Sequence, residues 1–391
     1  MRQLELKSAS TITRHAVNAA RLVMRCFLFS WLLLAATPAW AQEDVEREVA
    51  LPLVTLVQPP EVPKLETVEL AEGRAEEIEG LISDLSEVAE SDLSINSPYQ
   101  SPCFVPVGRF GFSGEWTGKP VEVSNSIRKL TEIGPEALPF LLAALGDESP
   151  TKIVIESVFR EGVVTRGLAF DEELHGNPAN PKEHFILKLN RYPYSASIRP
   201  NQDFFVPPEM EAYRVKIGDV CLVVIGQIVG RKYECLTTPH VKSVDIQVCS
   251  PVHRKAVRNR IRQIWATKNP RQKLLESLVL DFSTRGLQQM DSLDYWSIGN
   301  DFQIESIKRL LYYYPDFAVP LIVQRIDGLQ FSDDFVEDCV RNGLRADDLV
   351  DAVAWSQNAD IPAALTRLEP RATENTLREA LRRALPKTPE K

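Results

Sequence analysis

The stretch S-I-R-K-L-T-E-I-G-P-E-A-L-P-F-L-L-A-A-L, from Ser126 to Leu145, decides the fold class, because a near copy follows it 180 residues later. The copy reads S-I-K-R-L-L-Y-Y-Y-P-D-F-A-V-P-L-I-V-Q-R-I, from Ser306 to Ile326. In each copy a short amphipathic segment reaches a proline elbow, at Pro135 or Pro315, and a more apolar segment follows. Proline in the first turn begins a new helix, so both copies predict a helical hairpin. Such an internal sequence repeat is typical of repeat proteins, which mostly bind other molecules.

The residues between the two hairpins have a different composition and hydrophobic pattern. Short runs rich in β-branched residues alternate with Pro, Asn and Gly, a pattern that predicts strands. These runs are K-I-V-I-E-S-V-F from Lys152, H-F-I-L-K-L from His184, the long apolar run from Tyr213 to Val229, and V-D-I-Q-V from Val244. We therefore expect a mainly α protein with a β-containing insert (α+β), in which short hairpins replace a regular solenoid.

Composition and periodicity divide the rest of the chain. A Pro- and Glu-rich stretch after residue 41 predicts an extended linker. Apolar residues at helical spacing predict an amphipathic helix from Glu69 to Glu90, followed by a Gly/Pro-rich loop. The predicted organisation is 1–41 signal peptide, 42–68 linker, 69–118 amphipathic helix and loop, 119–151 first hairpin, 152–252 β-containing insert, 253–386 C-terminal helical block and 387–391 tail.

The two hairpins resemble degenerate HEAT-type αα repeats, in which a short helix, a proline elbow and a Leu-rich helix follow one another. This resemblance implies a fold of paired helices. A second stretch, Y-R-V-K-I-G-D-V-C-L-V-V-I-G-Q-I-V-G-R from Tyr213 to Arg231, is followed by V-C-S-P and a basic-aromatic helix. It is similar to uncharacterised bacterial proteins that carry signal peptides. This similarity implies an exported protein, and it implies no particular reaction.

The N-terminus has the pattern of an export signal. An apolar run from Cys26 to Ala36 follows Arg25 and precedes Ala39-Trp40-Ala41, an A-x-A cleavage pattern. The run is shorter than the ~20 apolar residues that a bilayer span needs. Met24 gives a more compact signal than Met1 and is the start we expect. The sequence therefore predicts an exported protein, periplasmic or at the cell surface or secreted, with no transmembrane span after cleavage.

Charge excludes one class of partner and leaves others open. Removal of residues 1–41, which hold five Lys/Arg and one Glu, changes the formal net charge from −9 to −13. Broad nucleic-acid binding requires a basic surface, so we expect no nucleic-acid partner. A protein or an envelope polymer remains a candidate partner.

The cysteines of the mature chain are odd in number. Five remain after cleavage, so at least one thiol is free or pairs between chains. Cys235 and Cys249 flank a turn-rich segment and are a candidate disulfide on neighbouring strands. Cys221 lies in an apolar run and is expected to be a buried free thiol. The sequence leaves the connectivity open.

A local basic run stands out on this acidic chain. Residues 253–273 are rich in Arg and Lys, and their guanidinium groups could bind phosphate, carboxylate or sulfate groups. The alternative is a solvated helix face that pairs with nearby acids. The candidate anion- or partner-binding residues are Arg254, Lys255, Arg258 and Arg262.

No catalytic or metal-binding motif emerges. His175 and His184 lie in an acidic loop, but without the helix spacing of known metal motifs, so we predict no metal site and no cofactor. No nucleophile motif is present, and no catalytic residue is assigned. The sequence favours a non-catalytic binding or scaffold protein and leaves enzyme activity open. Two alternatives remain: a hydrolase of envelope polymers with its site in the β-containing segment, and a structural subunit of an oligomer.

Overall fold

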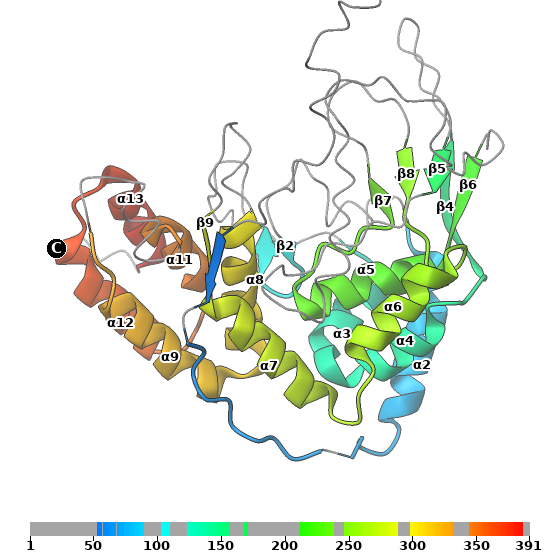
Figure 1. The fold of residues 1–391 in the computed structure, drawn as a ribbon, viewed down its shortest axis with the longest axis horizontal. Coiled ribbons are helices and arrows are strands. Elements are labelled where there is room, and N and C mark those ends of the chain that lie inside the picture. The colour runs from blue at the N-terminus through cyan, green and yellow to red at the C-terminus, as the bar shows by residue number, and fades with distance from the viewer. Residues whose placement is uncertain are drawn as a thin grey trace, which may run out of the picture. The chain divides into compact units, whose positions relative to one another are not determined.

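The computed structural model describes residues 53–56, 58–67, 69–89, 103–109, 123–156, 168–170, 212–237, 246–287, 298–331 and 344–385 (Figure 1). All of them belong to one unit, residues 52–391. The predicted signal peptide, the proposed start at Met24 and the tail lie outside the described residues. Among the described residues, no helix is both long enough and apolar enough to span a membrane.

Helices make up most of the described chain, as the sequence predicts. The helices are α2 (Arg74–Ser83), α3 (Asn125–Ile133), α4 (Leu138–Ala144), α5 (Ile217–Val229), α6 (Lys255–Trp265), α7 (Pro270–Ser283), α8 (Ile298–Tyr313), α9 (Pro315–Asp327), α11 (Ala346–Val353), α12 (Asp360–Leu368) and α13 (Asn375–Ala384). Short 3-10 helices are η2 (Asp84–Glu87), η4 (Gly134–Glu136) and η6 (Glu369–Arg371). The mainly α class with a β-containing insert is therefore confirmed.

The strands form small, separate sheets. They are β1 (Leu53–Leu56), β2 (Cys103–Phe104), β3 (Gly108–Arg109), β4 (Pro150–Glu156), β5 (Leu168–Phe170), β6 (Ala212–Lys216), β7 (Leu236–Thr237), β8 (Ile246–Val248) and β9 (Thr284–Leu287). The pairs β1–β9, β2–β3 and β4–β6 are antiparallel, and β8 lies between parallel β5 and antiparallel β7. The strands predicted from Lys152 and from Val244 match β4 and β8, whereas the run from His184 lies outside the described residues.

Both predicted hairpins form, and their elbows contact each other. The first is α3, η4 and α4, and the second is α8 and α9. Tyr313 lies against Gly134, where a Cβ atom would come within 2.4 Å of its ring, and its hydroxyl donates to the Thr131 carbonyl oxygen at 2.5 Å. Gly134 has a φ of 68°, which is favourable only without a side chain. The two copies of the sequence pattern are thus neighbours in space.

The strand predicted for the long apolar run is wrong beyond Lys216. The run opens as β6 and then forms the 13-residue helix α5, in which every residue is buried. A helix that is buried on all sides has no polar face, so its sequence lacks the 3.6-residue period and looks like a buried strand. Its length separates the two structures, because strands are commonly five or six residues long.

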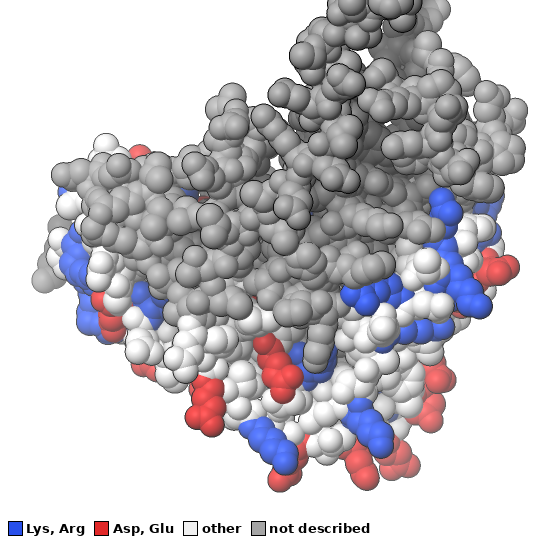
Figure 2. Space-filling model, viewed as in Figure 1, with Lys and Arg blue, Asp and Glu red and all other residues white. Residues whose placement is uncertain are grey.

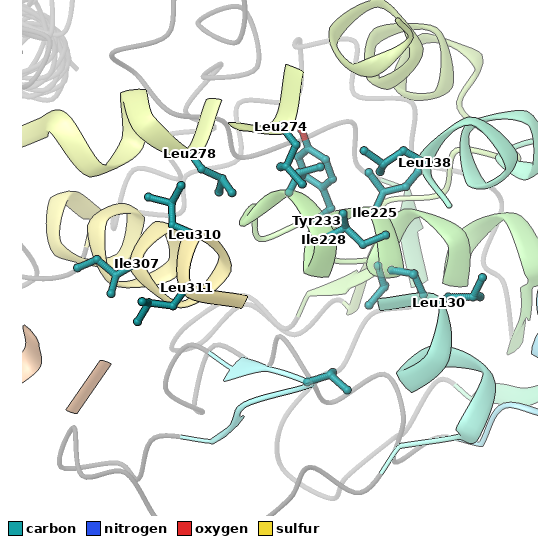
Figure 3. Packing of buried hydrophobic residues seen from close by; sticks show 14 of the residues in the cluster. Leu130, Leu138, Ile225, Ile228, Tyr233, Leu274, Leu278, Ile307, Leu310 and Leu311 are labelled. Atoms are coloured by element: carbon teal, nitrogen blue, oxygen red, sulfur yellow. The ribbon is translucent and has the colours of Figure 1, made fainter. Parts of the chain in front are cut away.

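Helix α5 is the centre of the core. It contacts α2, α3, α4, α7, η2 and β6. Figure 3 shows Ile225 and Ile228 between Leu138 of the first hairpin and Leu274 of α7. The chain after α5 crosses back over Gly226, where an added Cβ would lie 2.6 Å from the Arg231 carbonyl oxygen.

The C-terminal end of α5 is closed by two buried arginines. Arg309 Nε donates to the Gln227 carbonyl oxygen (2.7 Å), and Arg231 Nη1 donates to the carbonyl oxygens of Val229 (3.4 Å) and Gly230 (3.2 Å). The last carbonyls of a helix have no partner within it and carry partial negative charge, so cations stabilise this end.

Each arginine has a buried carboxylate of its own. Arg231 pairs with Asp281 at 2.5 Å and also donates to Ser277. Arg309 pairs with Glu305, which is 2.7 Å from Lys308 Nζ. A buried ion pair is tolerable only when its remaining donors are satisfied, and the α5 carbonyls satisfy them here.

The segments before α3 depart from the predicted boundaries. Helix α2 begins at Arg74 rather than Glu69, because Gly73 has a φ of 77° and turns the chain, and Leu70 is exposed. The predicted linker is not free either: it contains β1, and Leu65 bonds through its N–H to Gln272 and through its carbonyl to Asn269. In the segment predicted to be a Gly/Pro-rich loop, Phe104 is fully buried.

Glu305→Gln is expected to destabilise the fold by about 3 to 5 kcal/mol at neutral pH, because it leaves Lys308 and Arg309 buried without their carboxylate. Urea unfolding of Glu305→Gln, with the exposed Glu379→Gln as the matched control, measures this difference. No more than about 0.5 kcal/mol is expected for the control.

The difference in unfolding free energy between wild type and Glu305→Gln should depend on pH in a defined direction. Burial raises the pKa of Glu305, but Lys308 and Arg309 outweigh it and lower the pKa to about 2. Because this lies below the usual 4.5, the stabilisation is complete above pH 4.5 and is lost as the pH falls through about 2. A gap between wild type and Glu305→Gln that stays constant down to pH 2 would contradict this assignment.

Candidate functional site

The four candidate binding residues lie on or beside one helix. Lys255, Arg258 and Arg262 belong to α6, and Arg254 is its N-cap residue. Lys255 is exposed and the three arginines are partly exposed. We call these four residues the basic face. No Asp or Glu occurs between residues 246 and 275, although the chain as a whole is acidic. On the side shown in Figure 2, Lys and Arg side chains gather over the region of α6 and near β6.

Two arginines of the basic face bind backbone carbonyls. Arg262 Nε donates to the Leu142 carbonyl oxygen (2.8 Å), and its Nη2 donates to that of Ala143 (3.0 Å). These are the last carbonyls of α4, where a cation is favoured by the helix dipole. Arg258 Nη1 donates to the Pro251 carbonyl oxygen at 3.0 Å. The face is therefore rigidly held on the first hairpin.

A buried polar cluster holds the chain that leads into α6. Asp219, in the first turn of α5, accepts hydrogen bonds from the Tyr213 hydroxyl (2.5 Å), the Ser250 hydroxyl (2.6 Å) and the Lys216 N–H (2.9 Å). Ser250 in turn accepts from the His253 N–H at 3.2 Å. Asp219 thus closes the N-terminal end of α5 and fixes the loop from Ser250 to His253.

The protonation of this cluster follows from its burial. Desolvation raises the pKa of Asp219, and the hydrogen bonds from Ser250 and Tyr213 oppose this rise. Desolvation also raises the pKa of Tyr213, and the carboxyl of Asp219 raises it further, so the phenol stays protonated and donates. A neutral donor facing a buried acceptor is a stable arrangement at neutral pH.

The cluster contains residue types that also occur in hydrolases. A nucleophilic serine needs a histidine within hydrogen-bond reach to take its proton. Here the Ser250 hydroxyl is fully buried and donates to Asp219, and the His253 backbone N–H donates to Ser250. The side chain of His253 is exposed and its ring lies edge-on to Tyr213 at 5.7 Å. The hydrogen bonds of Asp219 join β6, the start of α5 and the loop before α6.

The candidate disulfide residues are neighbours. The Cys249 N–H donates to the Cys235 carbonyl oxygen at 2.9 Å, and both residues are buried. Their sulfurs are not bonded to each other in this structure, so the disulfide stays a prediction. Cys221 is a fully buried free thiol, as predicted, and burial raises its pKa.

Other candidates lie elsewhere or pack in the core. His175 and His184 fall outside the described residues. Within the described ranges, no group of three His, Cys, Asp or Glu side chains is placed to hold a metal ion. The aromatic residues of the second hairpin pack with Phe104, whose ring centroid is 5.4 Å from that of Tyr312 and 5.7 Å from that of Tyr313.

Comparisons with known proteins find no match for this chain. No family model, curated protein or solved structure matches it. The resemblance to HEAT-type repeats therefore stays a prediction, and function must be argued from the residues themselves.

The supporting polar residues were not predicted from the sequence, although a signal was present. Asp219 is the only charged residue between Ile217 and Gly230, and Arg231 directly follows that stretch. A single charge inside a long apolar run indicates a buried, partnered group, because an unpartnered one would be too costly. The partners Ser250 and Asp281 are distant in sequence and had no such signal.

Arg262→Gln and Lys255→Gln remove the same charge from the same helix and should differ in effect. Arg262→Gln breaks two hydrogen bonds to α4 and is expected to cost about 1 to 3 kcal/mol. Lys255→Gln changes an exposed side chain and should stay within about 0.5 kcal/mol. Chemical denaturation of both variants tests the difference, and equal losses would mean that Arg262 does not hold α4.

Proposed function

We propose that this chain is an exported, non-catalytic binding protein whose basic face docks a linear anionic polymer of the cell envelope. The observation that carries the proposal is the way the arginines are held. Arg258 and Arg262 bind neutral carbonyl oxygens, which fixes their geometry, and among the described residues no carboxylate pairs with either of them. A solvated helix face would instead pair its cations with nearby acids.

The spacing of the cations suits a chain of repeated charges. Residues 254, 258 and 262 are four positions apart, and a helix rises 1.5 Å per residue. Their attachment points therefore repeat about every 6 Å along one side of α6. A polymer with phosphate or carboxylate groups at regular intervals can meet several of them at once.

The helix itself adds to the positive potential. Arg254, Lys255 and Arg258 occupy the N-cap and the first turn, no side chain caps this end, and no acid is present there. The N-terminal end of a helix carries partial positive charge, so these cations are unfavourable for α6 alone. An anion bound at this end would relieve that repulsion. The acidic remainder of the chain restricts binding to this face, because it repels polyanions elsewhere.

Lys255→Glu is expected to weaken binding of inorganic polyphosphate on the order of tenfold, because two units of charge change at the exposed N-terminal end of the face. Fluorescence anisotropy with labelled polyphosphate at low ionic strength measures the affinity, and added salt should weaken the wild-type binding. Poly-glutamate of equal length shows whether carboxylates serve as well as phosphates.

The matched control is Lys129→Glu, which makes the same change at an exposed residue of α3. The control should bind like the wild type. Equal affinity of Lys255→Glu, Lys129→Glu and wild type would overturn the proposal, as would an absence of wild-type binding to both polymers.

A further inference from the structure

Cys235 and Cys249 continue the ladder between β7 and β8. The ladder pairs Leu236 with Val248 and Thr237 with Gln247. One step further along the same antiparallel register, Cys235 is opposite Cys249, and the 2.9 Å bond from the Cys249 N–H to the Cys235 carbonyl oxygen confirms this. Residues directly opposite in a ladder project to the same side of the sheet. Both side chains are therefore on one side, and both residues are buried.

The spacing of such a pair suits a disulfide. A hydrogen-bonded antiparallel pair has Cα atoms about 5.5 Å apart. Disulfides span Cα separations of about 4.4 to 6.8 Å, most often near 5.5 to 6 Å. Cys221 lies in α5 and has no place in this ladder.

We propose that Cys235 and Cys249 form a disulfide when the chain folds under oxidising conditions, while Cys221 remains a thiol. Two S–H bonds break and one S–S bond forms. The two protons and the two electrons pass to a disulfide-bearing oxidant, whose S–S bond breaks to give two thiols. Because both thiols are buried in the folded chain, the bond forms during folding rather than afterwards.

The bond would fix the start of the loop that carries the basic face. Cys249 directly precedes Ser250, whose hydroxyl donates to Asp219. Helix α6 begins at Lys255, five residues after Ser250. A covalent link at Cys249 holds this loop to the strand on the other side of the ladder. The proposal is independent of the anionic ligand, and it concerns the redox state of the fold alone.

Peptide mapping tests the pairing. The full chain is unfolded in reductant, refolded in a buffer of reduced and oxidised glutathione, denatured, alkylated and digested with trypsin. The three thiols fall in different peptides, which are Ile217–Arg231, Tyr233–Lys242 and Ser243–Arg254. We expect the second and third peptides to be joined, with a mass two hydrogens below their sum, and the first to be alkylated. Alkylation of Cys235 and Cys249, or a link from either to any other cysteine of the chain, would overturn the proposal.

Thermal unfolding gives a second measurement. The midpoint of the oxidised wild type should fall when reductant is added, because the bond restricts the unfolded chain. The Cys221→Ala variant should keep this fall, whereas the double variant Cys235→Ala and Cys249→Ala should lose it. A fall of the same size in the double variant would contradict the proposal.

Discussion

The burial of α5 on all sides is the constraint on which the structure depends. A helix leaves unpaired N–H groups at one end and unpaired carbonyls at the other, and a fully buried helix has no water to satisfy them. At the first end, the N–H groups of Ile217 and Gly218 donate to the carbonyl oxygens of Ser149 and Asp147, and Asp219 accepts from the N–H of the N-cap residue. Arg231 and Arg309 satisfy carbonyls at the second end. Arg231 forms its ion pair with Asp281 of α7, and Arg309 forms its ion pair with Glu305 of α8. Because both arginines also bind the end of α5, these ion pairs connect the insert to the C-terminal block.

The same constraint positions the basic face. At its N-terminal end, α5 holds Ser250 through Asp219, and the loop from Ser250 leads directly into α6. Arg258 and Arg262 then hold α6 on that loop and on the end of α4. Within the described part of the chain, the groups that hold Arg258 and Arg262 are neutral carbonyl oxygens.

The sequence predicts the periodic parts of this structure well. The hairpin from Ser126 has a clear helical period and a Gly-Pro elbow, and α6 and α11 are equally clear from their apolar spacing. The sequence fails at α5, because a helix without a polar face has no period to detect. The basic face was predicted as a set of residues, but its attachment to the carbonyls of α4 was not. Contacts such as Arg262 with Leu142 join residues 120 positions apart, and no local pattern encodes them.

Native-state hydrogen exchange tests the central role of α5 most directly. If the core is built around this helix, its amides should exchange only when the whole unit unfolds, with an opening free energy equal to that of global unfolding. The amides of α12 and α13, which lie away from α5, should open at lower free energy. Faster exchange in α5 than in α12 and α13 would contradict the account, because it would show that the body stays folded while its buried helix opens.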